Sequence, residues 1–463
     1  MSTSTTQPVQ SSKKSTWLIN RNYRFLFVGQ TISLLGDQLS TYTIILWIVT
    51  IIAVGQSWGP LAISAVLVSS MLPNFLIGPL AGVYVDRWDS RITMIRMDII
   101  RAVLAGLLVL CTGIIPLPPV FHIRIVLLST ICMLVFLSSA CSQFFNPAYM
   151  SLLAKIVSPE ERPQAAGLGQ TMQAFAMIVG PLLAAPLLFS FGVQWALLID
   201  ALSFIVSFIT IIAIRAVLSS VTSSEQSNFW RELKEGLHFS FSNRTIRTII
   251  VASFIATLGA GAFDALYVFF LTGNLHAPAS LTGVVATTMG LGTIVGAVIA
   301  ARIAKLLSLE NLFACSLAGI GLCLIVTSRL TFLPPALILF LLFGMFLAAL
   351  RVASGPLLLN ETPQTMIGRV FAVLGPTSTI ASLVSAMLSG FLASVLLVHL
   401  HVQVLGTTFG PIDTIFVGVG LLFVLSALYS YRVLARKEPQ PERTEDVLTI
   451  EEEVPFAEKE VQS

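Results

Sequence analysis

The chain has 463 residues, of which 56% are hydrophobic and 11% are charged, and its mean hydropathy is +0.89. Soluble domains average about 25% charged residues, so this composition argues against a soluble protein. The net charge of +3 is too small to indicate a nucleic-acid partner. The five cysteines are odd in number and fit neither a disulfide framework nor a zinc site, so we expect no metal and no cofactor.

Apolar segments dominate the chain from its first span onward. Residues 1–16 are rich in Ser and Thr, lack the apolar core of a signal peptide, and are expected to be disordered. A bilayer-spanning helix needs about 20 mostly apolar residues. Twelve segments meet this need, at 22–54, 60–85, 92–115, 124–147, 165–190, 195–217, 245–272, 279–303, 308–329, 335–359, 370–398 and 411–433.

The second half of the chain repeats the first. Residues 20–24 (Asn-Arg-Asn-Tyr-Arg) lead into an apolar stretch that ends at Leu35-Gly36. About 220 residues later, residues 243–247 (Asn-Arg-Thr-Ile-Arg) lead into one that ends at Leu258-Gly259. We therefore expect an N-terminal six-helix bundle over 17–217 and a C-terminal one over 244–436. Two equivalent membrane halves are typical of an alternating-access transporter whose binding site lies between them.

Basic residues predict the orientation of the spans. If both termini are cytoplasmic, all but four of the 26 Lys and Arg residues fall at the inner face, as the positive-inside rule requires. The exceptions are Arg101, Arg124, Arg329 and Arg351. We expect a multi-pass protein of a bacterial plasma membrane, with a cytoplasmic linker at 218–243 and an acidic cytoplasmic tail at 437–463.

The linker has an amphipathic pattern. Trp230, Leu233, Leu237 and Phe241 recur at helical spacing beside charged residues, which predicts a short helix on the inner membrane surface. A docking site for a partner is the alternative interpretation.

The loop between the second and third spans carries a motif over residues 82–91 (Gly-Val-Tyr-Val-Asp-Arg-Trp-Asp-Ser-Arg). Gly82 allows two helices to approach closely, and Asp86 begins a tight turn. Arg87 and Arg91 are able to pair with carboxylates or with the carbonyls at a helix C-terminus. The loop is therefore either a charged latch that gates the transporter or an ordinary positive-inside loop.

This loop resembles the loop 2–3 signature of the major facilitator superfamily. Residues 98–102 (Asp-Ile-Ile-Arg-Ala), 146–148 (Asn-Pro-Ala), 199–204 and 368–370 resemble its third drug:proton antiporter branch, which includes macrolide-efflux and enterobactin-exporter proteins. The resemblance covers roughly residues 17–436. It implies an all-α membrane protein of twelve transmembrane helices in two pseudo-symmetric six-helix bundles. Asp89 and Ser90 depart from the superfamily pattern, and Ala300 stands near the acid expected in the second half.

The fifth span carries small residues at Gly167 and Gly180, followed by Pro181. This pattern is similar to the antiporter signature of the family, which implies a helix that seals the cytoplasmic side and marks exporters. Small residues permit close packing and Pro181 bends the helix, so generic packing is the alternative.

Acids inside apolar helices are costly unless they are partnered or face water, so each is a functional candidate. Asp37 lies near mid-membrane in span one, and Asp264 lies in span seven, its repeat mate. Either is expected to couple protons or to pair with a cationic drug, with helix packing as the alternative. Asp98 and Arg101 are three residues apart, which predicts a pair just inside the cytoplasmic end, with a gating role. A structural role is expected for Asp200, near the outer end of span six.

Arg351 interrupts the apolar run of span ten. A buried Arg needs a carboxylate or an anionic ligand. Asp264 is the predicted intramolecular partner, and contact with an acidic substrate is the alternative.

Together these features predict a proton-coupled efflux transporter that exports amphipathic small molecules or drugs and works as a monomer. Its expected partners are the substrate, protons and the lipid bilayer. One alternative is export of a siderophore-like metabolite, and another is a non-transporting membrane sensor or scaffold. No nucleophile–base arrangement indicates an enzyme, and no Gly-Lys-Ser/Thr loop indicates ATP drive.

Overall fold

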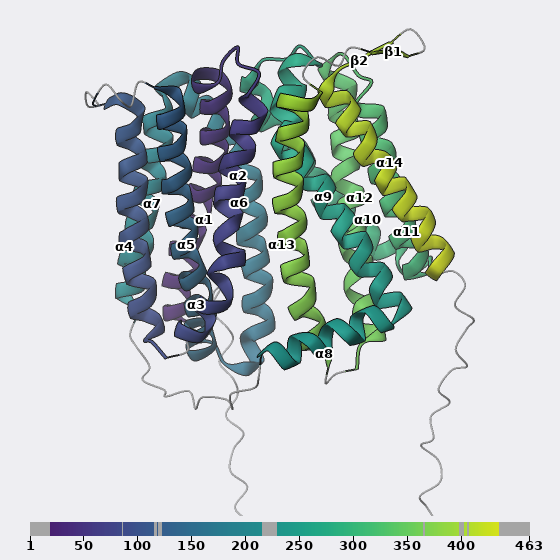
Figure 1. The fold of residues 1–463 in the computed structure, drawn as a ribbon. Helices are drawn as coiled ribbons and strands as arrows, with labels where there is room; N and C mark the ends of the chain where they lie inside the picture. Colours follow the sequence, from purple (N-terminus) through teal and green to yellow (C-terminus); the bar gives the residue numbers. More distant parts are fainter. Residues whose placement is uncertain are drawn as a thin grey trace, which may run out of the picture.

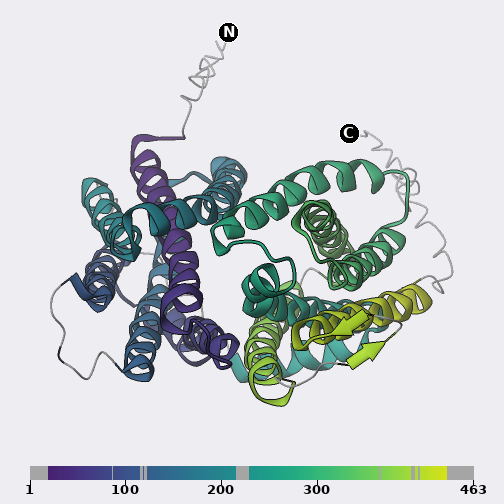
Figure 2. The ribbon, with the colours of Figure 1, turned by 90° about the horizontal axis from the view of Figure 1, so that it is seen from above.

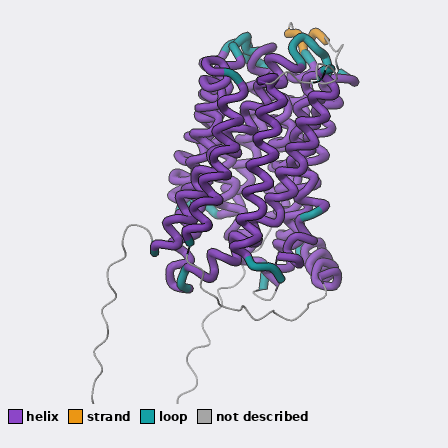
Figure 3. Tube along the Cα trace, turned by 90° about the vertical axis from the view of Figure 1, so that its left-hand side faces the viewer, coloured by secondary structure: helices purple, strands orange, loops and turns teal. Residues whose placement is uncertain are grey.

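A computed structural model describes residues 19–85, 87–114, 118, 123–214, 229–363, 366–397, 402–404 and 407–434. Twelve helical segments among these residues are long and apolar enough to cross a membrane, which confirms the predicted number of spans. They run side by side through the molecule (Figures 1 and 3). The predicted terminal tails, most of the linker before residue 229, and Asp86 lie outside the described residues.

The first half contains six spans. Its helices are α1 (Arg21–Trp47), α2 (Gly59–Leu76), α3 (Gly78–Val85), α4 (Ser90–Val109), α5 (Arg124–Ile156), α6 (Arg162–Phe191) and α7 (Val193–Ala213). π-Helical turns extend α1 over Ile48–Ile52 and α4 over Leu110–Ile114, and a 3-10 turn at Pro159–Glu161 precedes α6.

The second half contains the linker helix and six further spans. Its helices are α8 (Phe229–Ser242), α9 (Arg244–Gly273), α10 (Thr282–Ile303), α11 (Leu309–Thr327), α12 (Leu333–Glu361), α13 (Ile367–Phe391) and α14 (Pro411–Leu434). A 3-10 turn at Ala279–Leu281 precedes α10, and a π-helical turn at Leu392–Leu396 extends α13. Strands β1 (Val402–Val404) and β2 (Thr407–Phe409) pair antiparallel, with Val402 opposite Phe409.

The sequence repeat sets equivalent helix starts. The Asn20 side chain caps α1 by accepting a hydrogen bond from the Tyr23 backbone N–H at 2.8 Å. The Asn243 side chain caps α9 in the same way, accepting from the backbone N–H groups of Thr245 and Ile246. Each asparagine thus satisfies amides that the first turn of a helix leaves without partners.

The two halves pack by the same scheme, as two groups of helices (Figure 2). In the first bundle α1 packs on α6 and α7, and α4 on α5 and α7; in the second, α9 packs on α13 and α14, and α11 on α12 and α14. Gly36 and Gly259 hold equivalent places. A Cβ at Gly36 would lie 2.8 Å from the Ser203 Cβ of α7, and one at Gly259 would overlap the Phe423 ring of α14. The repeated glycines therefore let span one meet span six, and span seven meet span twelve, at close range.

The second predicted span is interrupted. The sequence predicted one helix over 60–85, but α2 ends at Leu76 and α3 begins at Gly78. Pro73 lies inside α2 and has no backbone N–H to donate to the Ser69 carbonyl, so the hydrogen-bond ladder is weakened one turn before the break. Where α6 meets α7, Gly192 alone forms the connection with φ of +95°, a conformation that favours glycine.

Lipid-facing surfaces are apolar, as expected where no water hydrates the backbone. Val103, Ile209 and Leu425 have exposed fractions of 58%, 56% and 60%. The interior of the second bundle is aromatic. Phe263 of α9 contacts Phe340 and Phe343 of α12 and Phe416 of α14, with ring centroids 5.6–5.9 Å apart.

Contacts between the bundles gather at one end of the molecule. We call the end that holds α8 and the start of α1 the tail end, and the opposite end the far end (Figure 1). Near the far end a Cβ at Gly390 of α13 would lie 3.0 Å from the Pro60 carbonyl oxygen of α2. Likewise, a Cβ at Gly283 of α10 would lie 2.5 Å from the Pro181 carbonyl oxygen of α6.

The tail-end half of the same helices is less tightly packed. A Cβ at Gly167 of α6, at Gly355 of α12 or at Gly375 of α13 would meet no atom within 4 Å. The bundles therefore touch at the far end and along α2 and α13 as far as Asn74, whose side chain donates to the Thr379 hydroxyl at 3.3 Å, whereas these three tail-end glycines meet no neighbour.

Candidate functional site

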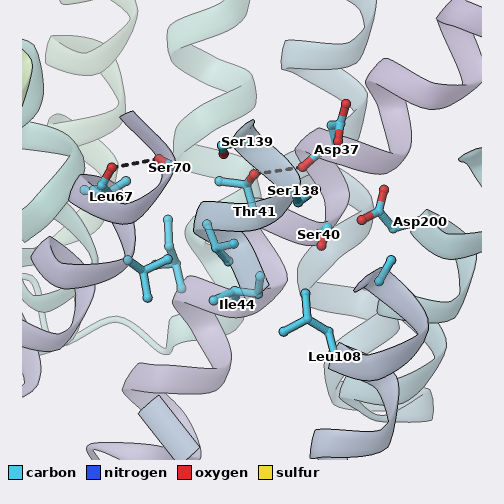
Figure 4. A pocket seen from close by; sticks show the side chains of 14 residues that line it. Asp37, Ser40, Thr41, Ile44, Leu67, Ser70, Leu108, Ser138, Ser139 and Asp200 are labelled. Atoms are coloured by element: carbon cyan, nitrogen blue, oxygen red, sulfur yellow. Dashed lines mark hydrogen bonds between the residues drawn. The ribbon is translucent and has the colours of Figure 1, made fainter. Parts of the chain in front are cut away.

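A pocket lies inside the first bundle, between α1, α2, α4, α5 and α7. Its cavity volume is about 100 Å³. One part of its wall carries carboxyl and hydroxyl groups, from Asp37, Ser40, Thr41, Ser70, Ser138, Ser139 and Asp200. Figure 4 shows these groups around the space, with Ile44, Leu67 and Leu108 on the apolar part. Such a wall suits a ligand with one polar head and an apolar body.

Asp37 is the partner of a buried arginine. The Arg101 guanidinium donates to both carboxylate oxygens of Asp37, at 2.7 and 2.8 Å. The Arg101 side chain is 6% exposed, whereas the Asp37 side chain is 36% exposed. The guanidinium also lies over the Phe204 ring at 4.1 Å and near the Phe145 ring at 5.9 Å. Asp37 therefore faces the pocket while Arg101 lies behind it.

The predicted pairing of Asp98 with Arg101 is wrong in this conformation. Both lie on one face of α4, as their spacing predicts, but that face packs against α7, and Asp37 reaches the guanidinium from α1. Asp98 has an exposed fraction of 0%, and neither of its oxygens has a well-formed hydrogen bond.

The depth of this pair also corrects the prediction. Arg101 is eleven residues beyond Ser90, or about 16 Å along α4 at 1.5 Å per residue. It therefore lies near mid-membrane and not just inside the tail end. Asp200, predicted to have a structural role near the outer end, contributes to the pocket wall.

The serine hydroxyls of the pocket were missed by the sequence interpretation. Ser138 and Ser139 on α5 and Ser70 on α2 are among several small polar residues in these largely apolar helices. Their pattern alone does not separate a pocket hydroxyl from one that bonds its own helix, as Ser70 does to the Leu67 carbonyl at 2.7 Å.

One arginine of the motif between α3 and α4, Arg91, is hydrogen-bonded to the end of α7. The Arg91 Nε donates to the Ile211 carbonyl at 3.1 Å, and its Nη2 donates to the Ile212 carbonyl, both near the end of α7. This is the carbonyl contact that the sequence suggested for Arg91. Asp89 caps α4 by accepting from the Ile92 N–H at 2.9 Å, and Arg87 is exposed.

Of the three glycines predicted to bring helices close together, Gly180 does so, whereas Gly82 and Gly167 do not. A Cβ at Gly82 or at Gly167 would meet no atom within 4 Å, so neither glycine brings two helices together here. A Cβ at Gly180 would lie 2.5 Å from the Gln38 Cβ of α1. Next to it, the Pro181 carbonyl contacts α10 near Gly283, so the Gly180-Pro181 step lies where α6 meets both α1 and the other bundle.

Asp264 faces the first bundle. It is the exposed residue in a buried stretch of α9, and it interacts electrostatically with Tyr42 of α1. Among the described residues, its carboxylate has no ion pair.

The predicted ion pair between Arg351 and Asp264 is not found among the described residues. Asp264 is nine residues before the far end of α9, or about 13 Å, whereas Arg351 is eighteen residues into α12, or about 27 Å. This difference in depth keeps the two side chains apart. Arg351 is exposed. By its helical spacing it lies on the same face of α12 as Phe340 and Gly344, which contact α9 and α10 respectively.

The linker helix is attached to the second bundle. Glu235 of α8 pairs with Arg369 of α13 at 2.7 Å, and a Cβ at Gly236 would lie 2.5 Å from the Arg369 carbonyl oxygen. Leu237 and Phe241 are 47% and 48% exposed. This arrangement fits the predicted surface helix, with an apolar face available to lipid.

Three kinds of comparison place the chain among known proteins. A sequence profile described as transmembrane secretion effector matches residues 14–421. The MFS-type transporter YkuC of Bacillus subtilis is 25% identical over 440 residues, which cover 91% of this chain and 94% of YkuC. Macrolide efflux protein A of Streptococcus pyogenes is 22% identical over 373 residues, which cover 80% of this chain and 88% of that protein.

Solved structures share the fold at low identity. A bacterial homologue of the iron transporter ferroportin, in its inward-facing state, has a TM-score of 0.65 and 16% identity, covering 89% of this chain and 97% of its own. An auto-inhibited peptide transporter of the POT family has a TM-score of 0.67 and 11% identity, covering 90% and 98%. These likenesses establish the architecture of two six-helix bundles.

Proposed function

Because the chain belongs to the major facilitator superfamily, in its macrolide-efflux-like branch of transmembrane secretion effectors, we propose that it exports amphipathic small molecules in exchange for protons. The protein is a multi-pass membrane transporter and not an enzyme. The observation that carries the proposal is the pocket wall on which Asp37, half-buried and paired with Arg101, faces hydroxyl groups and an apolar surface.

The pocket supports an amphipathic substrate by its chemistry. A carboxylate inside a membrane protein attracts a cation or a proton, and the apolar side chains favour a hydrocarbon body. A cationic head would compete with the Arg101 guanidinium for the negative charge at Asp37, so binding of a cation changes the charge balance of the site.

The conformation supports an alternating-access cycle. In our proposal the tail end is cytoplasmic, since the basic residues collect there. Separation of the far-end contacts at Gly283 and Gly390 would then open the path between the bundles to the outside. A cysteine at Lys234 on α8 tests the orientation: an impermeant thiol reagent should label it only in permeabilised cells, and labelling in intact cells would overturn the orientation.

Transport into proteoliposomes tests the function. The panel contains a macrolide, a lipophilic cation and an acidic amphiphile, each offered with and without an imposed pH gradient. We expect gradient-driven uptake of the first two by the wild type, and loss of the gradient dependence in Asp37→Asn. Serine substitution at Cys315, which is exposed on α11, provides a matched control outside the pocket. Uptake that is the same with and without the gradient would contradict proton antiport.

One observation favours a second candidate. Arg351 is an exposed cation deep in α12, and a metabolite with a carboxylate or a catecholate would complement it. Preferred transport of the acidic amphiphile, lost in Arg351→Met, would favour export of such an anionic metabolite over export of cations.

A further inference from the structure

Several unsatisfied polar atoms surround one guanidinium inside the first bundle. Both carboxylate oxygens of Asp98, Oδ1 of Asp200 and Nε of Arg101 are buried and lack a well-formed hydrogen bond, and the groups beside the two acids are the Ser207 hydroxyl for Asp98 and the Ser40 and Ser203 hydroxyls for Asp200. Buried polar atoms are nearly always paired in native proteins, so such a group indicates an arrangement that changes during function. Arg101 interacts electrostatically with Asp37, Asp98 and Asp200, which come from three different helices.

Charge balance limits which of these acids are ionised together. One guanidinium neutralises one carboxylate, and in this conformation it pairs with Asp37. Asp98 and Asp200 are 0% and 5% exposed, and an uncompensated charge at such sites is strongly disfavoured. Both therefore carry protons while Arg101 pairs with Asp37. Of the groups around Arg101, Cys141 on α5 is the remaining titratable one.

Access to the pocket distinguishes the two protonated acids. Asp200 contributes to the same pocket wall as Asp37, and both carboxyl groups lie beside Ser40 in Figure 4. Asp98 does not line the pocket and lies beside Ser207 on α7. A proton released by Asp200 has a direct path to pocket water, whereas one on Asp98 does not.

We propose that Arg101 is a switching counter-ion that pairs with Asp37 in the empty pocket and with Asp200 when a cationic head occupies Asp37. The inference rests on the proposed export function and names how one site exchanges cation for proton. The arriving cation takes over the Asp37 carboxylate, and the Arg101 hydrogen bonds to Asp37 break. The O–H bond of Asp200 then breaks, its proton passes to pocket water, and the Asp200 carboxylate accepts the guanidinium. One positive charge enters and one leaves, so the charge of the cluster is conserved.

The geometry around Arg101 allows this motion. The guanidinium carbon lies 4.1 Å from the centre of the Phe204 ring, and Phe204 is four residues beyond Asp200 on α7, one helical turn away. Arg101 can therefore turn towards Asp200 while it stays over the same ring. Gly36 permits the approach, because a Cβ there would lie 2.8 Å from Asp200 Oδ1.

The first test needs no substrate. Asp37→Asn removes the charge that holds Arg101, so an experimentally determined structure of this full-length variant should place the guanidinium within hydrogen-bond distance of Asp200. Asp98→Asn is the matched variant, and in it the Arg101–Asp37 pair should remain. An Asp37→Asn structure in which Arg101 keeps its position, or pairs with Asp98, overturns the proposal.

The second test counts protons in purified protein. Tetraphenylphosphonium is a suitable probe because its permanent charge carries no proton of its own. In weakly buffered solution, wild type and Asp98→Asn should release about one proton per bound probe. Asp200→Asn should bind the probe and release none. Equal release by Asp200→Asn and wild type overturns the switch. If wild type neither binds nor transports the probe, the proposed cation export fails, and the Asp37→Asn structure still decides the switch.

Discussion

Replacing Arg101 by Met, Asp37 by Asn, and both together measures how strongly these side chains are coupled within the first bundle. Their closest N–O distance is 2.7 Å, and the Arg101 side chain is 6% exposed. Breaking a buried ion pair costs about 3–5 kcal/mol of unfolding free energy, because it leaves one buried charge without a partner. Arg101→Met also loses the contact with Phe204, worth about 1 kcal/mol.

The two single variants should differ. Arg101→Met leaves the Asp37 carboxylate without its cation, so we expect it to cost about 3 kcal/mol, at the low end of that range, because Asp37 is 36% exposed. Asp37→Asn should cost only about 1–2 kcal/mol, since Asp98 and Asp200 remain near the guanidinium. The interaction energy from the double-mutant cycle should then be about 1–3 kcal/mol.

A second ion pair in the same protein provides the control. Glu235 and Arg369 also approach to 2.7 Å, but their side chains are 33–35% exposed. Solvent screening should reduce their coupling to about 0–1 kcal/mol. Equilibrium unfolding in mixed micelles, followed by tryptophan fluorescence, measures both cycles. A coupling for Asp37 and Arg101 that is no larger than the control would refute the reasoning that burial makes this pair strong.

Three further substitutions test other parts of the molecule. Asp264→Asn should reduce efflux driven by a pH gradient and change the unfolding free energy by less than about 1 kcal/mol, because the carboxylate is exposed; unchanged gradient dependence in vesicles would assign Asp264 to packing. Gly390→Leu should hold α2 and α13 apart at the far end, since even a Cβ would lie 2.7 Å from the Ser64 Cβ. A cysteine introduced at Ser394 should then react faster with a thiol reagent than the same cysteine in a chain that keeps Gly390. Equal labelling rates would contradict this expectation. Arg351→Met should shift substrate preference from anions towards cations in the transport panel while stability stays within about 0.5 kcal/mol; a loss of several kcal/mol would reveal a buried partner.

The sequence by itself determined the number of spans and the two-fold repeat. Both follow from local properties, namely the length of apolar segments and the residues that begin a helix. Asn20 and Asn243 are examples, because each caps its helix with its own side chain whatever the rest of the fold does. The linker helix was likewise readable from its spacing, since a surface helix must have one apolar face.

Only the tertiary structure decided which charges meet. The i, i+3 spacing of Asp98 and Arg101 fixed a shared face of α4, but the neighbours of that face are chosen by how α1 and α7 pack against it. Asp37 is 64 residues from Arg101 in sequence, and no local pattern encodes that contact. The predicted ion pair between Arg351 and Asp264 is not found for the same reason, because the relative depth of the two residues depends on where each helix begins in the membrane. The absence of close contacts at Gly82 and Gly167 has a related cause. A small residue permits a close contact between helices, but the packing of the whole bundles decides whether a second helix lies there.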